Sequence, residues 1–312
     1  MSDELSGRRI GWLGTGRMGS TLVRRLLAGG CDVSVYNRTK AKAELLAAPG
    51  AKIVDSVAEL AATDLVFVTV GTPQDLIEAV TGPAGLTSAA VAPRAVVDCS
   101  TVSAEASRQV REALAARGTE LLAAPSMGNA RVAAAGRRTF AVSGPRPTFD
   151  EVRPYLSLLG GGATYVGDGE PARSVKLCHN LFLGVVTQSL AEVTILAEKG
   201  GVKRAAFLEY LNRSVMGSTF TRYKAPALVN LDYHATFTSR LLHKDFDLGL
   251  QAASDFEVPM PVAALVAQII DTLVNEGYGD EDFAALIALQ ARAAGIAIES
   301  ENTDVPDGLS AL

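Results

Sequence analysis

Residues 9–40 read RIGWLGTGRMGSTLVRRLLAGGCDVSVYNRTK, in which a glycine-rich turn joins a short apolar segment to a helical pattern and a second apolar segment. Gly14, Gly16 and Gly19 have the spacing G-x-G-x-x-G at this turn. The first glycine permits a tight turn, the second lets a pyrophosphate approach the backbone, and the third allows the helix to pack closely on the strand. Because a helix N-terminus also presents N–H groups to phosphates, the segment predicts a dinucleotide-binding unit.

The end of the second apolar segment indicates which dinucleotide is bound. A site for NAD usually carries Asp or Glu there, about 20 residues after the glycines, to bind the ribose 2′-hydroxyl. This chain has Asn37, Arg38 and Thr39 instead. A neutral Asn does not repel a 2′-phosphate, Arg can form a charge-assisted hydrogen bond with it, and Thr adds a hydroxyl donor. NADPH is therefore predicted over NADH, with Arg17 and Met18 of the turn also beside the cofactor. The alternative is that Arg38 is an ordinary surface charge.

Alternating apolar and helical segments continue as far as Gly167. Extended segments are expected at 52–55, 65–70, 95–98, 121–124, 139–143 and 163–166, with helices at 40–48, 56–62 and 74–80. Because strand and helix alternate at the spacing of βαβ units, the sheet should be mainly parallel and covered on both faces. Residues 1–167 are thus predicted to form an α/β, doubly wound Rossmann domain.

The pattern after residue 167 is helical. One long segment without an internal proline runs from Pro171 to Lys199 and ends at a pair of glycines. Further helices are expected at 203–211, 219–225, 248–255, 261–275 and 281–294. Residues 168–300 should therefore form a long interdomain helix plus an all-helical C-terminal domain, and 301–312 a loose tail.

Composition restricts the possible partners. The 312 residues are 48% hydrophobic and 20% charged, with a net charge of −5, which gives no general attraction to nucleic acid or to an anionic membrane. The sequence contains no run of about 18 apolar residues, so no transmembrane helix is predicted, and the N-terminus lacks a secretory pattern. Cys31, Cys99 and Cys178 are far apart and are interpreted as reduced, buried thiols of a cytoplasmic protein. His234 and His243 have no spacing typical of a metal site, so a small-molecule substrate and no metal are expected.

Five segments occur in an informative order along the chain. They are GWLGTGRMG at 11–19, DCST at 98–101, APSMGNARVAAAG at 124–136, SVKLCHN at 174–180 and HKDFDLGL at 243–250. With this order the chain resembles the β-hydroxyacid dehydrogenase family, which includes 3-hydroxyisobutyrate dehydrogenases and semialdehyde reductases, with imine reductases as more distant relatives. The resemblance runs from Ile10 to about Ala297. It implies an NADPH-dependent oxidoreductase that interconverts a β-hydroxy acid and its semialdehyde, as a homodimer or homotetramer.

The resemblance also implies that Lys176 is the catalytic acid/base. Lys176 and Asn180 have i, i+4 spacing on the long helix, so both project from one face. An ammonium group can give a proton to a carbonyl oxygen as hydride reaches the carbon, and Asn180 can orient the substrate. By the same resemblance, Lys244 approaches the nicotinamide end of the cofactor and Asp245 helps to hold that corner. His179 is expected to be structural.

Further contacts follow from the resemblance. Thr101, directly after a strand, should contact the cofactor. The adenosine side should be lined by Val70, Gly71 and Thr72. Phe220 and Arg222, with Tyr223, are candidates for lining a cleft from the helical domain, although no spacing requires it.

The substrate loop departs from the family's usual D-A-P-V-S-G-G, in which the serine and paired glycines hold a substrate carboxylate. Ser126, Met127, Gly128 and Asn129 occupy the last four positions here. Met127 takes the place of the serine, and its thioether cannot donate the hydrogen bond that the serine would make. Ser126 is one position out of register, and Asn129 replaces a glycine. Arg131 is a new polar candidate, either as a ligand for an anion or as a surface charge.

Three functions remain open. The leading one is the reduction or oxidation of a semialdehyde and its β-hydroxy acid. An imine reductase or promiscuous carbonyl reductase is the second; Met127 favours it, but imine reductases usually have Asp or Tyr where this chain has Lys176. A non-catalytic NADPH-binding protein is the third, and the presence of both Lys176 and Asn180 argues against it.

Overall fold

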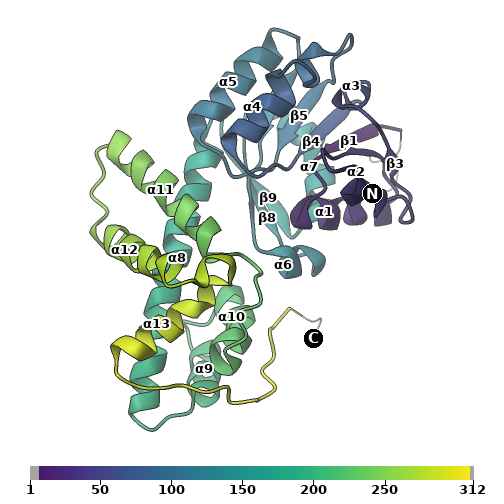
Figure 1. Cartoon of the computed structure of the whole chain (residues 1–312). Helices are drawn as coiled ribbons and strands as arrows, with labels where there is room; N and C mark the ends of the chain where they lie inside the picture. The colour runs from purple at the N-terminus through teal and green to yellow at the C-terminus, as the bar shows by residue number, and fades with distance from the viewer. Residues whose placement is uncertain (1–6, 310–312) are drawn as a thin grey trace. The chain divides into compact units, whose positions relative to one another are not determined.

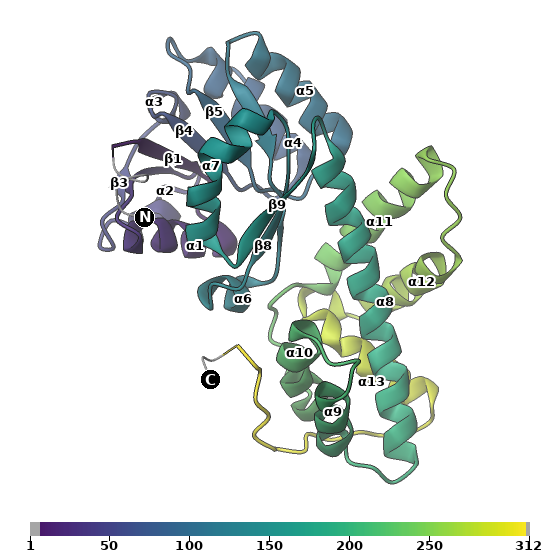
Figure 2. The same cartoon turned by 180° about the vertical axis from the view of Figure 1, so that it is seen from behind.

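The computed structural model describes residues 7–309, which divide into two compact units. The first, here called the sheet unit, ends at Lys176, and the second, the helical unit, begins at Leu177. Figures 1 and 2 show the elements of each unit from opposite sides. The sequence placed the boundary at residue 167. The two compact units divide within α8 (Pro171–Lys199), whose first turns pack with the sheet, where Ala172 joins a buried cluster with Ala123 and Ala141.

Within the described residues, the sheet unit has nine strands in the order β3-β2-β1-β4-β5-β6-β8-β7, with β9 beside β8. Strands β1 to β6 pair in parallel, whereas β8 is antiparallel to β6 and β7. This arrangement confirms the mainly parallel Rossmann sheet. Its strands are β1 (Arg9–Leu13), β2 (Asp32–Tyr36), β3 (Lys52–Ile53), β4 (Leu65–Val68), β5 (Ala95–Asp98), β6 (Glu120–Ala123), β7 (Ser126–Met127), β8 (Thr139–Ser143) and β9 (Gly162–Gly167).

Helices cover both faces of the sheet, and each face buries alternate residues of the same strands. On β4, Leu65 and Phe67 belong to one buried cluster, and Val66 and Val68 to another, as the pleat requires. Helices α1 and α7 complete the first cluster, and α3, α4 and α5 the second. The helices of this unit are α1 (Arg17–Ala28), α2 (Lys40–Glu44), α3 (Val57–Leu60), α4 (Pro73–Thr81), η1 (Leu86–Ser88), α5 (Ala104–Ala115), α6 (Ala130–Ala134) and α7 (Arg146–Leu159).

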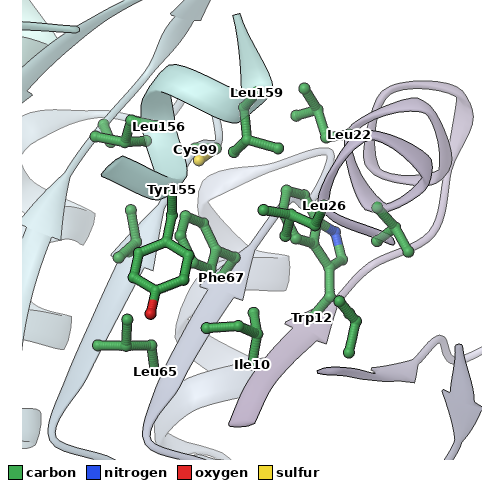
Figure 3. Close-up of a cluster of buried hydrophobic side chains, with 14 of the residues drawn as sticks. Ile10, Trp12, Leu22, Leu26, Leu65, Phe67, Cys99, Tyr155, Leu156 and Leu159 are labelled. Carbon is green, nitrogen blue, oxygen red and sulfur yellow. The ribbon is translucent and has the colours of Figure 1, made fainter. Parts of the chain in front are cut away.

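The first cluster fixes the start of the glycine-rich turn. Figure 3 shows Trp12 of β1 against Phe67 of β4, with Leu22 of α1 and Tyr155 of α7 nearby. The two rings stack with centroids 5.3 Å apart. The indole Nε1 donates a hydrogen bond to the carbonyl oxygen of Gly14 at 3.0 Å, which satisfies the buried indole and ties the turn to the core.

Helices α5 and α7 were not predicted from the sequence. Each presents an apolar stripe at helical spacing, which in α5 consists of Ala106, Val110 and Leu114. Both segments also contain many charged residues, which obscured this pattern. Helix α2 is shorter than expected, because Leu46 and Ala47 make turn hydrogen bonds to the carbonyl oxygens of Ala43 and Glu44. Strand β4 ends two residues early, and the N–H of Val70 donates a hydrogen bond to Oγ of Ser100 instead of to a neighbouring strand.

The helical unit contains the rest of α8 and the helices that follow it. Helix α11 begins nine residues earlier than predicted, at Ser239, because Thr238 accepts a hydrogen bond from the N–H of Leu241 and caps it. The segment predicted as one helix at 281–294 is instead a 3₁₀ turn followed by α13. The elements are α9 (Arg204–Arg213), α10 (Thr219–Asn230), α11 (Ser239–Asp255), α12 (Pro261–Asn275), η2 (Tyr278–Asp280), η3 (Phe283–Ala285) and α13 (Leu286–Ala293).

The segment after α13 was predicted to be a loose tail from residue 301, and for residues 301–309 the structure corrects this. The carboxylate of Glu301 accepts hydrogen bonds from the backbone N–H groups of Arg204 and Ala205, at 2.7 and 3.2 Å. These are N–H groups at the start of α9, which the helix itself leaves unpaired. Leu309 is buried as well. The segment lacks regular secondary structure but is held against the helices.

Two further expectations need adjustment. Cys31 and Cys99 are buried as predicted, and burial raises the pKa of Cys99 to about 12, but Cys178 is exposed on α8.

Helix α8 also contains an 18-residue window with a mean hydropathy of 1.4, so by length and composition alone it could cross a membrane. Half of that window is buried inside the protein, and core helices of soluble proteins meet the same criterion.

Candidate active site

The central parallel strands β2, β1, β4 and β5 end in register, so the loops that follow them lie at one edge of the sheet. Leu13 of β1 lies beside Tyr36 of β2 and Val68 of β4, and Val68 lies beside Asp98 of β5. The strand order reverses at β1, and ligands of open α/β sheets bind outside the carboxyl ends of the strands at such a point. The predicted cofactor residues of the sheet unit therefore belong to one neighbourhood.

The glycine-rich turn is packed so closely that two of its glycines cannot be replaced without movement. Gly14 has φ +94°, and a Cβ there would lie 2.1 Å from the carbonyl oxygen of Thr69. A Cβ on Gly19 would lie 2.0 Å from the carbonyl oxygen of Gly14. The turn is thus wedged between the end of β4 and the first turn of α1.

Gly16 differs from its neighbours, because its backbone suits any residue and a Cβ would meet nothing within 4 Å. Space for a ligand, not strain, therefore explains this glycine. Gly16 is also the N-cap of α1 and has no side chain to cap the helix, and Arg17 and Met18 form the first turn. Open space beside a helix N-terminus fits the pyrophosphate of a dinucleotide.

Asn37 has a structural role that the sequence did not reveal. Its Oδ1 accepts a hydrogen bond from the N–H of Thr15 at 2.9 Å, and its Nδ2 donates to the carbonyl oxygen of Thr39 at 3.0 Å. The side chain therefore joins the glycine turn to the start of α2. Thr39 is the N-cap of α2, but its side chain makes no capping hydrogen bond.

Arg38 forms an ion pair with Asp75, whose role was not predicted from the sequence. Their Nη1 and Oδ1 atoms are 3.3 Å apart, and the Arg38 side chain is 83% exposed. Asp75 lies in the first turn of α4, and Thr72 caps this helix because its Oγ1 accepts a hydrogen bond from the N–H of Asp75. A ligand phosphate at Arg38 would compete with this carboxylate.

The loop after β5 is joined to α8 by a buried ion pair. Arg173 and Asp98 are 1% and 0% exposed, with 2.5 Å between Nη2 and Oδ2. Arg173 also donates hydrogen bonds to the carbonyl oxygen of Ser100 at 2.8 Å and to Oγ of Ser107 at 3.2 Å. Ser100 in turn accepts a hydrogen bond from the N–H of Val70. The loops after β4 and β5 are thereby fixed to the first turn of α8, with Thr101 next in the chain.

Lys176 lies three residues after Arg173 on the same helix, so the anchor sets its position. Three residues advance a helix by about 4.5 Å and return nearly to the same face. Lys176 is 8% exposed, a degree of burial that is uncommon for lysine. Neither anchoring residue was predicted from the sequence, because they are 75 positions apart.

Asn180, Asp245 and Lys244 come together within the helical unit. The Nδ2 of Asn180 donates a hydrogen bond to the carboxylate of Asp245, and both side chains are 2% exposed. Nδ1 of His179 lies 2.9 Å from Oδ1 of Asn180. Lys244 Nζ lies 3.2 Å from the Asp245 carboxylate. Three residues assigned by resemblance thus form one connected group in which Asp245 fixes the amide of Asn180.

The substrate loop differs in detail from the prediction. Asn129 caps α6, because its Oδ1 accepts a hydrogen bond from the N–H of Val132 at 3.0 Å, so this oxygen is already committed. Gly128 has φ +112°. Ser126 is buried and Met127 half-buried in β7. Arg131 is exposed in α6.

The three side chains suggested as cleft-lining residues of the helical unit have other roles. Phe220 packs against Tyr223 and Phe283, with centroids 5.3 and 6.3 Å apart, in the unit's apolar core. Arg222 donates a hydrogen bond to the carbonyl oxygen of Asn212. Aromatic residues at helical spacing more often form a core than a ligand site, and that holds here.

Comparison with known proteins shows the family to which the chain belongs. Residues 9–167 match the NAD-binding domain of 6-phosphogluconate dehydrogenase, and 171–290 match the NAD-binding domain of NADP-dependent 3-hydroxyisobutyrate dehydrogenase. The chain belongs to the β-hydroxyacid dehydrogenase family. It is an NAD(P)-dependent oxidoreductase, as the resemblance predicted.

Individual members of the family match over nearly the whole chain. The chloroplastic glyoxylate/succinic semialdehyde reductase 2 of Arabidopsis thaliana is 31% identical over 93% of this chain and 81% of its own length. A 3-hydroxyisobutyrate dehydrogenase from Salmonella typhimurium is 25% identical, with a TM-score of 0.81 over 91% of this chain and all of the other. An imine reductase from Bacillus cereus, 20% identical over 91% of this chain and 99% of its own, has a TM-score of 0.58 and shares the fold.

Replacing Gly16 of this dehydrogenase should separate cofactor binding from folding. We expect Gly16→Ala to unfold at the wild-type temperature, because the new methyl group meets no protein atom. Binding of NADPH, measured by fluorescence titration, should weaken by about tenfold or more, because the methyl group occupies space intended for the ligand. Gly19→Ala is the comparison and should lose stability, since its Cβ meets a carbonyl oxygen. Unchanged binding by a folded Gly16→Ala variant would remove the pyrophosphate from this position.

Proposed function

We propose that this chain is an NADPH-dependent reductase that interconverts a carboxylate-bearing semialdehyde and its hydroxy acid, with Lys176 as the general acid/base. The observation that carries the proposal is the buried Lys176 on a helix turn anchored to the loop after β5. The names of the relatives support the substrate class, because glyoxylate and succinic semialdehyde each carry an aldehyde and a carboxylate.

The chemistry divides between cofactor and protein. Bound NADPH supplies the hydride that reduces the carbonyl carbon, and NADP⁺ accepts it in the reverse direction. The ammonium of Lys176 donates a proton to the carbonyl oxygen, which becomes the hydroxyl of the product. In the reverse direction the neutral amine accepts the hydroxyl proton. Burial of Lys176 limits exchange of this proton with bulk water.

Asn180 acts as an orienting donor in this proposal. Its amide is held by the carboxylate of Asp245, so its orientation does not depend on the substrate. A hydrogen-bond donor that is already oriented stabilises charge on an oxygen without reorganising during the reaction. Asp245 is therefore a positioning residue.

Removal of the Lys176 amine should abolish turnover but not cofactor binding. For Lys176→Ala we expect kcat with NADPH and succinic semialdehyde to fall by about 100-fold or more, a typical loss for a general acid. The dissociation constant for NADPH should stay at the wild-type value. Lys199→Ala, an exposed lysine at the other end of α8, is the matched control and should remain active. Normal turnover by Lys176→Ala would exclude Lys176 from the proton transfer.

Preference for NADPH over NADH is the second part of the proposal, and it rests on Arg38 beside Asn37. A guanidinium is suited to a 2′-phosphate, whereas the 2′-hydroxyl of NADH gains little from it. Arg38 is exposed, and a 2′-phosphate would displace the carboxylate of Asp75 from it.

Substitution of Arg38 should lower this preference. We expect Arg38→Ala to reduce kcat/KM for NADPH by about tenfold and to leave kcat/KM for NADH unchanged. Lys42→Ala, an exposed cation on α2, serves as the control and should keep the wild-type ratio. A wild-type enzyme that favours NADH would contradict this part of the proposal alone.

Imine reduction is the second candidate function, favoured only by Met127 in the substrate loop. Assays with cyclic imines beside semialdehydes separate the two. Turnover of imines without any turnover of semialdehydes would replace the leading proposal.

A further inference from the structure

Arg138 is a buried cation at the substrate loop that neither the sequence nor the family match pointed to. It directly precedes β8 and is 5% exposed. Its Nη1 donates a hydrogen bond to the carbonyl oxygen of Gly128 at 2.5 Å, and its Nη2 donates to that of Ser126 at 3.3 Å. Nη1 also contacts the sulfur of Met18 in the first turn of α1. The guanidinium therefore lies between the cofactor turn and the substrate loop.

This buried charge has no compensating carboxylate among residues 7–309. The acidic group that interacts with it is the thiol of Cys99, which follows β5. Burial lowers the pKa of Arg138 to about 10, so the guanidinium still carries its charge at neutral pH. The other buried arginines illustrate the contrast, because Arg173 pairs with Asp98 and Arg204 with Glu198.

Two polar atoms at this place also lack hydrogen-bond partners in the described part of the chain. They are Nε of Arg138 and Oγ of Ser126, both fully enclosed. A buried polar atom without a partner costs about 1–3 kcal/mol, and an uncompensated buried charge costs more. A bound anion would offset this cost.

We propose that Arg138 determines specificity for carboxylate-bearing substrates, by placing an uncompensated positive charge beneath the loop of Ser126 to Asn129. This inference rests on the proposed function and assigns its selectivity to one residue. Met127 cannot donate a hydrogen bond to a carboxylate, so attraction by a buried cation takes over that task. In a buried site the attraction acts at low dielectric and is only weakly screened by salt.

The position of Arg138 favours the substrate over the cofactor phosphates as the anion. Nη1 and Nη2 of Arg138 donate hydrogen bonds to carbonyl oxygens of the substrate loop, and Nη1 approaches α1 at the thioether of Met18. The phosphates are already served by the helix N-terminus after Gly16. The charge of Arg138 thus remains for a second anion.

The test compares a charged aldehyde with a neutral aldehyde of the same shape. Succinic semialdehyde and 4-methylpentanal differ in that an isopropyl group replaces the carboxylate. For Arg138→Met we expect kcat/KM for succinic semialdehyde to fall by about tenfold or more, mainly through KM. The value for 4-methylpentanal and the dissociation constant for NADPH should not change. Arg138→Lys should restore most of the selectivity, and Arg137→Met, the exposed neighbouring arginine, should behave as wild type.

Three results would overturn the inference. Equal losses for both aldehydes would mean that Arg138 only supports the loop, and weaker NADPH binding with unchanged selectivity would assign it to the cofactor.

Should the wild type reduce neither aldehyde, the proposed function fails, and Arg138 is then tested by calorimetric titration of succinate into the protein with NADP⁺. Succinate binding that is lost in Arg138→Met supports the inference, and equal binding or no binding by both proteins overturns it.

Discussion

The buried ion pair between Asp98 and Arg173 is the interaction on which the candidate active site depends. It joins the carboxyl end of β5 to the first turn of α8, and through Ser100 it also fixes the loop after β4. Removing one partner of a buried ion pair typically costs about 3–5 kcal/mol, because the remaining charge is left without compensation. Lys176 follows one turn later, so the fold sets the position of the proposed acid/base relative to the cofactor edge of the sheet.

Three charged side chains in the sheet unit are thus used in different ways. Arg173 is compensated by a carboxylate and serves structure, whereas Arg138 is not, and we propose that Arg138 attracts a substrate anion. Arg38 lies at the surface in an ion pair with Asp75, where a phosphate can displace the carboxylate. Arg173 and Arg138 are both buried, and they differ in that only Arg173 has a carboxylate partner.

Much of the fold and part of the site could be predicted from the sequence, because the signals are local. The glycine turn, the strand–helix alternation and the i, i+4 pair on α8 each lie within a short segment. The roles of Arg138, Arg173 and Asp75 could not be predicted, since their partners are distant in sequence or are backbone carbonyl groups. Asn129 and Phe220 show the opposite case, in which a residue suited to a ligand site is used for helix capping or for the core.

The proposed function requires that hydride pass from NADPH to an aldehyde on this protein. The direct measurement is to incubate the purified enzyme with succinic semialdehyde and each of the two stereoisomers of NADPH deuterated at C4 of the nicotinamide. Mass spectrometry should find one deuterium on the carbinol carbon of 4-hydroxybutyrate with one stereoisomer and none with the other. Absence of label with both stereoisomers, for succinic semialdehyde and for other carboxylate-bearing aldehydes, in a protein that binds NADPH, would contradict the account.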